Sequence, residues 1–338
     1  MKHGEGTPLR ILVAGFGSIG KRHVRNLRSH TPIEVIAYRV GGEPLPPEFQ
    51  GDWITETSDL DEALALGPTA ALVCSPPSHL LSVALPIARA GCHLFIEKPL
   101  SHTLEGVQEL VSLVKEKNLV SLMGYNLRYQ PGLQLVKSFL DKGRIGRVVS
   151  LRVQVGQYLP DWHPWENYRI SYASSMRLGG GVVLTQIHEI DYLYWFFGKV
   201  FEVYGLTGKL SDLEIDVEDY AVCLLKFKNK IIAEIHLDYF QKPSVRNCKI
   251  IGRKGQIRWN WENNHVQIFK NKDKKWVTKN FEKKFDKNKM YVDELEYFFN
   301  CVKRKKTPMN SIIDRLEPQK IALAIKESSK CGKKIRIK

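Results

Sequence analysis

The stretch at residues 9–20, LRILVAGFGSIG, decides the fold. Its first six residues are mostly apolar and branched, which is typical of a central parallel strand buried on both faces. The motif Gly15-x-Gly17-x-x-Gly20 follows at once, and residues 21–28 then have the pattern of a helix. A strand, a glycine-rich turn and a helix in this order predict a loop that holds the phosphates of a dinucleotide.

Each glycine of the motif has a separate structural role. Gly15 permits the tight turn, Gly17 lets the backbone approach a pyrophosphate, and Gly20 allows the helix to pack close to the strand. Ser18 and Ile19 stand at the helix N-terminus, where backbone N–H groups point toward an anion. We therefore expect these five residues to bind the cofactor.

The choice of dinucleotide depends on the end of the second strand, expected over residues 33–38. The residue that meets the adenosine ribose lies roughly 20 positions beyond the glycines, which falls on Tyr38 and Arg39. No carboxylate stands there to hold the 2′-hydroxyl of NAD. Arg39 could pair with a 2′-phosphate and stack on adenine, or be an exposed loop arginine. The first interpretation predicts NADP in preference to NAD.

The alternation of strands and helices continues to residue 124 and predicts a doubly wound parallel sheet. Strands are expected over 70–74, 93–96 and 119–123, with a helix over 103–118. The loop Ser75-Pro76-Pro77-Ser78-His79 follows the strand expected over residues 70–74, and open α/β sheets bind ligands at such strand ends. We expect Ser75, Pro76 and His79 to lie at the cofactor.

The segment Glu97-Lys98-Pro99 places an amine where another strand of the same domain ends. Removing a hydride from a carbinol requires its O–H proton to leave, and an amine within hydrogen-bond reach can take it. Burial beside an oxidised cofactor ring would lower the pKa of that amine toward neutrality. We expect Glu97 and Lys98 at the cofactor and Lys98 at the substrate as acid/base; the alternative is a solvated loop lysine.

At this point the chain resembles the Gfo/Idh/MocA oxidoreductases over nearly its whole length. The resemblance implies an N-terminal Rossmann domain over residues 1–124. A C-terminal α/β domain over 125–338 would bind substrate and form oligomers through a large open, mostly antiparallel sheet. The motifs that carry it, in chain order, are GFGSIG at 15–20, Pro77-x-His79, Glu97-Lys98-Pro99, GYNLRYQP at 124–131, GRIG at 143–146, GGG at 179–181, HEID at 188–191, Glu294 to Phe299 and Lys306-Thr307-Pro308.

The resemblance also implies an activity. Family members use NAD or NADP to oxidise or reduce a carbon that bears a hydroxyl or keto group, on a sugar, a nucleotide sugar or a cyclitol. Lys98 matches the family's acid/base and would precede a cis peptide bond to Pro99. His188 matches the histidine near the substrate hydroxyl, and Tyr125 and Arg128 fall in a motif at the same site. The open sheet would make a homodimer or homotetramer.

The chain departs from the family at Thr185, where many relatives carry an aspartate one turn before the histidine. A threonine hydroxyl can hydrogen-bond a substrate or an imidazole, but it holds no negative charge. His188 then has an anionic neighbour only if Glu189 or Asp191 turns inward. The departure supports an alternative function, a catalytically weak dinucleotide-binding sensor or scaffold.

An aromatic stretch over residues 158–169, YLPDWHPWENYR, mixes rings with hydrogen-bonding side chains. A sugar's apolar face stacks on rings while its hydroxyls need polar partners, so we expect Trp162, Trp165 and Arg169 to bind substrate. It resembles stretches in family members from surface-polysaccharide biosynthesis. The alternative is an ordinary aromatic loop that packs on the sheet or at a subunit interface.

The amino-acid composition limits which partners, metals and cellular locations are expected for this chain. The net charge of +15 is typical of nucleic-acid binders, but no recognition motif accompanies it, so a solvated basic face is expected. The six cysteines have neither bridge nor ligand spacing, which predicts reduced thiols and no metal. No apolar run is long enough for a bilayer, and residues 1–8 lack a signal core. We expect a cytoplasmic protein without membrane or specific nucleic-acid partners.

Overall fold

The structure, a computed structural model, describes residues 9–30, 33–41, 44–282, 285–314 and 316–337. Residues 1–8, for which the sequence predicts no signal core, lie outside this set. The chain divides into two compact units, Met1–Gly124 with Tyr291–Arg315, and Tyr125–Met290 with Leu316–Lys338. The sequence-based division placed 291–315 in the second domain, whereas in the structure this segment groups with the first unit.

The described residues of the first unit form a six-stranded sheet in the order β3-β2-β1-β4-β5-β6. Every neighbouring pair is parallel, as predicted. The strand order reverses between β1 and β4, which creates a switch point at their carboxyl ends. The strands are β1 (Leu9–Ala14), β2 (Ile33–Tyr38), β3 (Ile54–Thr57), β4 (Ala70–Val73), β5 (His93–Glu97) and β6 (Ser121–Gly124).

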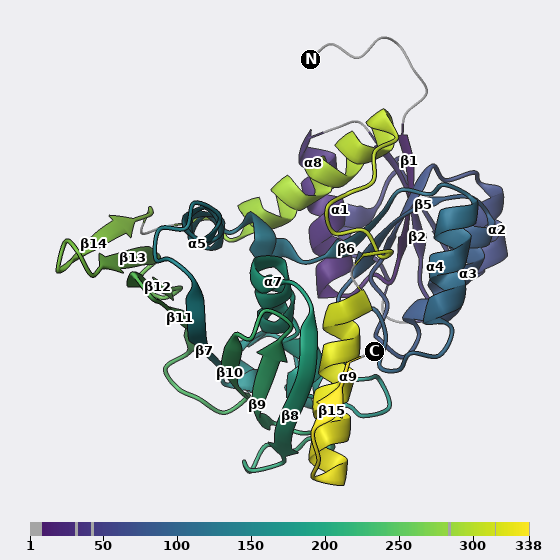
Figure 1. Ribbon diagram of the computed structural model, residues 1–338. Coiled ribbons are helices and arrows are strands. Elements are labelled where there is room, and N and C mark those ends of the chain that lie inside the picture. Colours follow the sequence, from purple (N-terminus) through teal and green to yellow (C-terminus); the bar gives the residue numbers. More distant parts are fainter. Residues whose placement is uncertain (1–8, 31–32, 42–43, 283–284, 315, 338) are drawn as a thin grey trace. The chain divides into compact units, whose positions relative to one another are not determined.

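Helices cover both faces of this sheet because successive strand residues point to opposite sides. Ile11 and Val13 pack with Val24 of α1 and with Phe298 of α8 in one buried cluster. The other face, which includes the fully buried Leu12, lies under α3 and α4 (Figure 1). The helices are α1 (Ser18–His30), α2 (Leu60–Ala65), α3 (Leu80–Arg89), α4 (Val107–Glu116) and α8 (Asn288–Arg304).

The helix expected over residues 103–118 is shorter at its start. It begins at Val107, and the preceding Gly106 has φ +72°, a left-handed conformation that ends any helical run before it. The preference of residues 103–106 for helix is therefore overruled by the backbone at one glycine.

The second unit contains a nine-stranded sheet in the order β14-β13-β12-β11-β7-β10-β9-β8-β15. Only the pairing of β7 with β10 is parallel among its described strands, so the expectation of a large, mostly antiparallel sheet is confirmed. The strands are β7 (Val148–Gly156), β8 (Val200–Gly208), β9 (Tyr220–Phe227), β10 (Ile232–Asp238), β11 (Val245–Gly252), β12 (Gly255–Asn260), β13 (His265–Lys270), β14 (Lys275–Asn280) and β15 (Ile335–Arg336).

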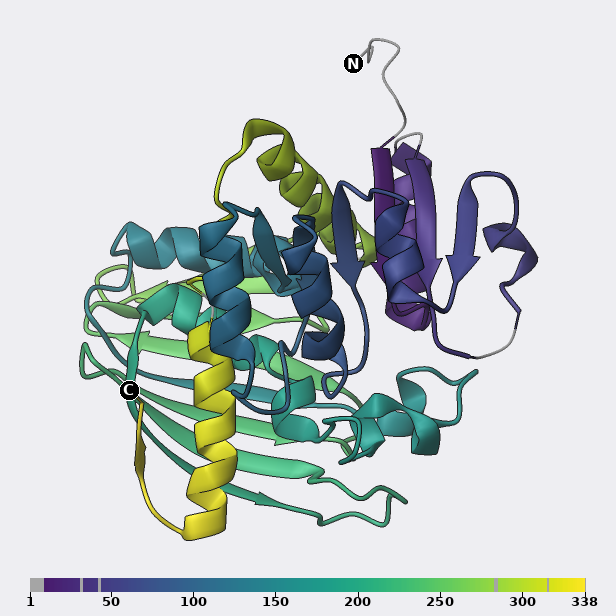
Figure 2. The same ribbon diagram turned by 90° about the vertical axis from the view of Figure 1, so that its right-hand side faces the viewer.

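Helices of the second unit pack on one face of this sheet, with α9 running along β8 (Figure 2). Strand residues alternate accordingly: Ala233, Ile235 and Leu237 of β10 are buried, whereas Ile232 on the opposite face is 47% exposed. The main helices are η2 (Asn126–Tyr129), α5 (Pro131–Asp141), α6 (Val182–Thr185), α7 (His188–Phe197) and α9 (Leu316–Cys331). Within the described residues, no helix has both the length and the apolar character needed to cross a bilayer.

Candidate active site

The glycine loop joins β1 to α1 at the switch point of the first sheet. Gly15 has φ +98°, and a Cβ there would lie 2.8 Å from the carbonyl of Cys74. A Cβ on Gly20 would lie 2.1 Å from the Gly15 oxygen, whereas one on Gly17 would meet nothing within 4 Å. Two positions therefore require glycine for close packing, and the space beside the third is open to a pyrophosphate. The loop fits the dinucleotide that the sequence predicts.

Tyr38 is the last residue of β2. The side chain of the next residue, Arg39, contacts the neighbouring strand β3. The Arg39 Nε lies 3.2 Å from Oε1 of Glu56 on β3, and the Arg39 side chain is only 12% exposed. Arg39 is thus held in place, and the alternative of an exposed loop arginine is wrong. Glu56 was missed from the sequence because its position beside Arg39 depends on the pairing of β2 with β3.

The loop after β4 lies beside the glycine loop. The Ser75 hydroxyl donates to the Ala14 carbonyl across 3.3 Å, and the Cys74 N–H donates to the same oxygen across 2.7 Å. Pro76 is half-buried, and His79 is exposed at the start of α3, with its Nδ1 3.1 Å from the Ser78 hydroxyl. Ser75 is therefore the residue of this loop that contacts the phosphate-binding turn.

Lys98 follows the last residue of β5 and is half-buried, and its peptide bond to Pro99 is cis, which confirms the conformation that the resemblance implies. The strands of this sheet are parallel, so Lys98 and the glycine loop lie at the same edge. The Glu97 carboxylate, expected at the cofactor, instead lies 2.7 Å from the buried His23 imidazole.

In the second unit, Thr185 ends α6 and His188 begins α7, so the two residues do not share one continuous helix. Thr185 is 3% exposed. Burial raises the pKa of Tyr239, and a hydrogen bond from Thr185 acts in the opposite direction. The Thr185 hydroxyl, which stands where many relatives have an aspartate, therefore contacts Tyr239. The sequence did not predict a role for Tyr239 because it belongs to no recognised motif.

The two carboxylates that follow His188 are both engaged by arginines. Glu189 Oε1 lies 2.9 Å from Nε of Arg246, and Asp191 is bound by Arg128 through two hydrogen bonds. Both carboxylates that the sequence offered as anionic neighbours of His188 are therefore paired with arginines.

The rings around His188 form a compact group. Tyr125 meets the His188 ring edge to face with 6.1 Å between centroids, and the Arg128 guanidinium lies 5.9 Å from the Tyr125 ring and 5.6 Å from the Trp195 ring. Arg128, expected to contact substrate, is instead a buried partner of Asp191 with a side chain 1% exposed. Of the three guanidinium nitrogens of Arg128, Nε and Nη2 bind Asp191, and Nη1 has no hydrogen-bond partner among the described residues.

The aromatic stretch over residues 158–169 divides into packed and exposed parts. Trp162 packs edge to face on the Tyr239 ring at 5.3 Å, and its Nε1 donates to the Gln157 carbonyl. Trp165 is 76% exposed, and Arg169 is exposed and ion-paired with Glu214. Trp162 thus behaves as part of an aromatic loop on the sheet, while Trp165 and Arg169 reach solvent.

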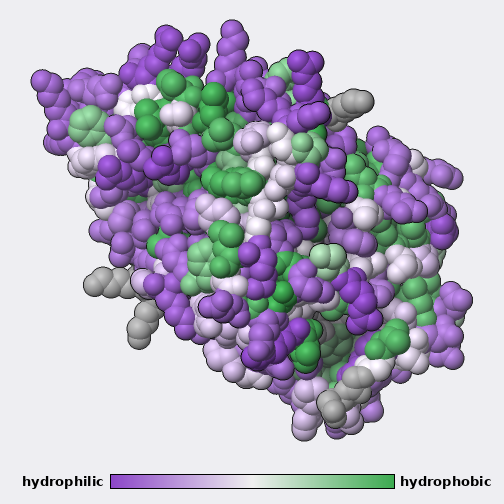
Figure 3. All heavy atoms as spheres, turned by 90° about the horizontal axis from the view of Figure 1, so that it is seen from below, coloured by the Kyte–Doolittle hydropathy of each residue, from purple (hydrophilic) through white to green (hydrophobic). Residues whose placement is uncertain are grey.

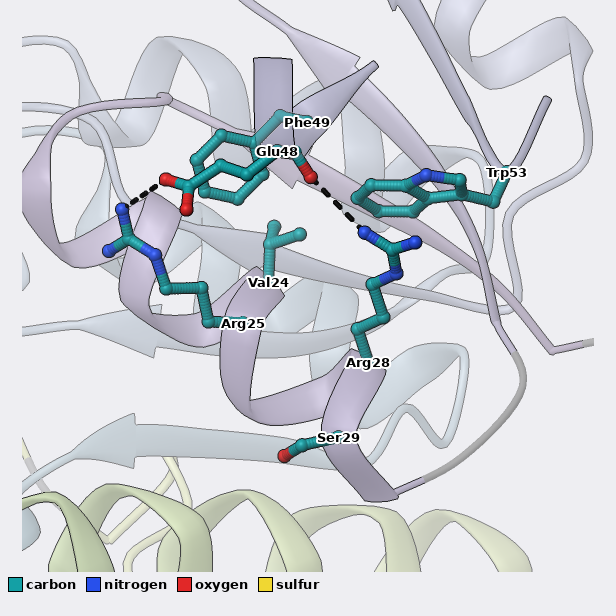
Figure 4. A pocket seen from close by; sticks show the side chains of 7 residues that line it. All are labelled: Val24, Arg25, Arg28, Ser29, Glu48, Phe49 and Trp53. Carbon is teal, nitrogen blue, oxygen red and sulfur yellow. Dashed lines mark hydrogen bonds and ion pairs between the residues drawn. The ribbon is translucent and has the colours of Figure 1, made fainter. Parts of the chain in front are cut away.

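A hollow of about 280 Å³ lies on the C-terminal half of α1, away from the glycine loop at its other end (Figure 4). Its cations are already paired: Arg25 with the Glu48 carboxylate, and Arg28 with the Glu48 carbonyl and the face of Trp53. None of the predicted site residues lines it, so it is separate from the candidate active site.

The cysteines do not form a site in the described part of the chain. Five are buried, Cys331 is exposed, and all six are free thiols. Among residues 9–30, 33–41, 44–282, 285–314 and 316–337, no group of three histidines, cysteines or carboxylates is placed to hold a metal.

Both sheets of the chain match models of one known protein family. A family model described as the NAD-binding Rossmann fold of an oxidoreductase family, Gfo/Idh/MocA, matches residues 9–125, and the model of that family's C-terminal alpha/beta domain matches residues 137–337. The two models together cover most of the chain and correspond to the two sheets.

Relatives of assigned activity are dehydrogenases and reductases of sugars and inositols. The levoglucosan dehydrogenase of Pseudarthrobacter phenanthrenivorans is 27% identical over 213 residues, 55% of this chain and 54% of the relative. The myo-inositol 2-dehydrogenase of Thermotoga maritima is 29% identical over 261 residues, 74% of each chain. The chain thus aligns with about half the length of the first relative and about three quarters of the second.

Solved structures share the fold. A levoglucosan dehydrogenase in complex with NADH superposes with a TM-score of 0.85 at 20% identity, covering 98% of this chain and 100% of that one. The WlbA dehydrogenase from Bordetella pertussis, in complex with NADH and UDP-GlcNAcA, gives 0.80 at 23% identity, covering 98% and 99%. Together with the two family models, these likenesses confirm the fold and the resemblance read from the motifs. The chain belongs to the Gfo/Idh/MocA family of oxidoreductases and carries its NAD-binding Rossmann fold.

Proposed function

We propose that the protein transfers a hydride between a nicotinamide dinucleotide and a hydroxyl- or keto-bearing carbon of a sugar, nucleotide sugar or cyclitol. The observation that carries the proposal is the placement of Lys98 at the carboxyl end of β5, on the same sheet edge as the glycine loop. An amine at that edge lies where the reactive end of a dinucleotide on the loop is expected. The names of the relatives supply the substrate class.

The nicotinamide supplies the hydride acceptor or donor when it is bound. Lys98 would then accept the hydroxyl proton in the oxidising direction, or donate a proton to the developing alkoxide in the reducing direction. Backbone N–H groups at Ser18 and Ile19 would hold the pyrophosphate, and Ser75 and Pro76 would border it. His188 would hydrogen-bond the substrate hydroxyl, and the Thr185 hydroxyl would assist without a charge.

The choice between NAD and NADP depends on Arg39 and on its ion-pair partner Glu56. Arg39 would meet a 2′-phosphate, which favours NADP, while the Glu56 carboxylate would repel that phosphate and compete for the guanidinium. We propose that Arg39 selects NADP and that Glu56 limits the margin of that selection.

The substrate side of the proposal uses residues of the second unit. The exposed Trp165 and the half-buried Trp162 would offer apolar faces for a sugar ring. Arg169 would attract a carboxylate or phosphate if it left Glu214. An anionic nucleotide sugar would fit this set.

The open face of the second sheet supports self-association. Leu206 is 59% exposed and Leu224 is 45% exposed, and the register places Tyr204 of β8 opposite Leu224 of β9. Figure 3 shows hydrophobic patches within a mostly hydrophilic surface on the face that it views. Exposed apolar side chains gathered on one sheet face are typical of interfaces, so we propose a homodimer or homotetramer.

Light scattering on the parent and on Leu206→Glu tests the oligomer; a monomeric parent would contradict it. A cytoplasmic location and the lack of a specific nucleic-acid partner remain predictions, and a sequence-dependent gel shift at physiological salt would overturn the second.

The competing function, a sensor that binds dinucleotide without turnover, rests on Thr185, which stands where many relatives carry an aspartate. The experiment that separates the two functions incubates the protein with NAD or NADP and a panel of sugars, nucleotide sugars and cyclitols, in both directions, while following the absorbance of reduced nicotinamide. The proposal expects turnover on at least one member. Tight dinucleotide binding with no turnover across the whole panel would favour the sensor.

A further inference from the structure

Glu97 precedes the proposed acid/base in the chain, yet its carboxylate is directed into the interior of the first unit. Glu97 is 8% exposed, and its Oε1 lies 2.7 Å from Nε2 of His23 on α1. The other oxygen, Oε2, accepts a hydrogen bond of 3.3 Å from the backbone N–H of Lys98. One carboxylate therefore links a buried imidazole to the peptide of the lysine.

The surroundings of His23 indicate which of its two ring nitrogens carries a proton. The side chain is 0% exposed, and its ring lies edge to face with Phe95 at 5.0 Å and with Tyr291 at 6.1 Å. Its Nδ1 is buried without a hydrogen-bond partner among the described residues. A proton on Nδ1 would have no acceptor, so we place a proton on Nε2, which donates it to Glu97.

The space around the carboxylate is closely fitted. A Cβ on Gly124, at the end of β6, would lie 3.1 Å from the Glu97 carboxyl carbon and from Oε2. A side chain at this position would require the carboxylate to shift by a few tenths of an ångström. Glycine at position 124 thus has a role that the motif alone did not reveal.

Other ionisable groups face this carboxylate from the neighbouring elements. Burial raises the pKa of Cys74, after β4, and the charge of Glu97 raises it further. Burial raises the pKa of Tyr291 on α8, and Arg22 of α1, whose guanidinium lies 4.7 Å from the Tyr291 ring, lowers it. Glu97 and Lys98 both act electrostatically on Tyr291. Cys74 and Tyr291 are neutral at neutral pH, so they neither neutralise Glu97 nor compete for its charge.

We infer that His23 is a positioning residue, which holds the Glu97 carboxylate in the interior and so keeps it from pairing with the amine of Lys98. An adjacent carboxylate that turned to the amine would favour the ammonium form and hold the lysine away from its substrate. Because the inference rests on the proposed role of Lys98, its test uses a readout that requires neither cofactor nor substrate.

The experiment measures the reactivity of the Lys98 amine directly. The parent, His23→Leu and His23→Gln are treated with limiting acetic anhydride at several pH values, and mass spectrometry quantifies acetylation at Lys98 against the exposed Lys117 of the same chain. His23→Leu is expected to lower the relative rate at neutral pH about tenfold, which corresponds to one unit in the pKa of the amine. Glutamine can still donate to the carboxylate, so His23→Gln should stay within about twofold of the parent.

The double variant His23→Leu/Glu97→Gln provides the control. With the carboxylate removed, Lys98 should regain the reactivity of the parent. If His23→Leu fails to fold, His23→Asn replaces it, because its amide is too short to reach Oε1 and it carries the same expectation. Parent-like acetylation of Lys98 in a folded variant without the His23 donor would overturn the inference.

The outcomes separate this inference from the proposed function. A tenfold loss of Lys98 reactivity in His23→Leu, with no turnover by the parent on any substrate, would contradict the function and support the positioning role. Unchanged reactivity of Lys98 in His23→Leu, with clear turnover by the parent, would contradict the positioning role and support the proposed function. Where turnover is found, His23→Leu should lower kcat more than it changes KM and should move the rise of the pH profile to higher pH.

Discussion

Arg128 of η2 holds both carboxylate oxygens of Asp191 on α7, with Nε 2.7 Å from Oδ2 and Nη2 2.5 Å from Oδ1. Their side chains are 1% and 2% exposed. Burial acts to lower the pKa of Arg128, but the charge and hydrogen bonds of Asp191 outweigh it and the pKa is raised. The pair fixes the segment that carries Tyr125 against the helix that begins with His188.

Removal of one partner should be costly because it leaves an uncompensated buried charge. Asp191→Ala is expected to lower the free energy of unfolding by about 3–5 kcal/mol, measured from urea unfolding. The matched control is Asp141→Ala, which removes the exposed partner of Lys137 and should cost less than about 1 kcal/mol. Similar losses in the two variants would contradict the structural role of the buried pair.

Arg39 and Glu56 should control cofactor choice in opposite directions. Arg39→Ala is expected to weaken NADP binding by about 1.5–3 kcal/mol, the range for charge-assisted hydrogen bonds, and to leave NAD nearly unchanged. Glu56→Gln removes the competing carboxylate and should tighten NADP relative to NAD. Titration calorimetry with both dinucleotides measures these changes, and equal affinities for NAD and NADP in the parent would remove the basis of the assignment.

The sheet of the first unit could be predicted because its strands are short, apolar and separated by glycine or proline loops. The second strand, expected over residues 33–38, is confirmed at Ile33–Tyr38. The helix expected from residue 103 begins at Val107, because one left-handed glycine overruled the helical preference of its neighbours. Local sequence shows periodicity well, but it does not show where the backbone turns.

The site was predictable where a motif fixes the backbone, and unpredictable where distant side chains meet. The glycine loop followed from its motif and the cis bond before Pro99 from the family resemblance. By contrast, Glu56 beside Arg39 and His23 beside Glu97 depend on packing between separate elements. Arg128 was expected to reach substrate because its motif lies near the site, but a carboxylate far along the chain pairs with it.

The cysteines should differ sharply in reactivity. Cys331 is exposed and the other five are buried, so a thiol reagent should label one cysteine in the folded protein and six after unfolding. Mass spectrometry after alkylation with iodoacetamide counts the labels. Rapid labelling of Cys223 or Cys248 in the folded protein would contradict their burial.

These thiols should also make the protein less stable in alkali. Burial raises the pKa of Cys92 to about 11 and those of Cys223 and Cys248 to about 12, while the unfolded chain titrates near 9.0. Their stabilising contribution is complete below about pH 9 and is lost as the pH rises through the folded values. Each thiol should lower the free energy of unfolding by about 1.4 kcal/mol per pH unit above pH 9. Urea unfolding between pH 8 and pH 11 measures the slope, and a flat profile would contradict it.

The central claim is that Lys98 transfers the proton that accompanies hydride transfer, and turnover by Lys98→Ala tests it most directly. On a substrate found in the panel, this variant should bind dinucleotide almost as the parent does and turn over roughly 10² to 10⁴-fold more slowly, the usual contribution of a positioned acid/base. Lys117→Ala, which removes an exposed lysine, should retain parental turnover, and His188→Ala should lose less than Lys98→Ala. Lys98→Ala with unchanged turnover on that substrate would contradict the account even though the fold is right.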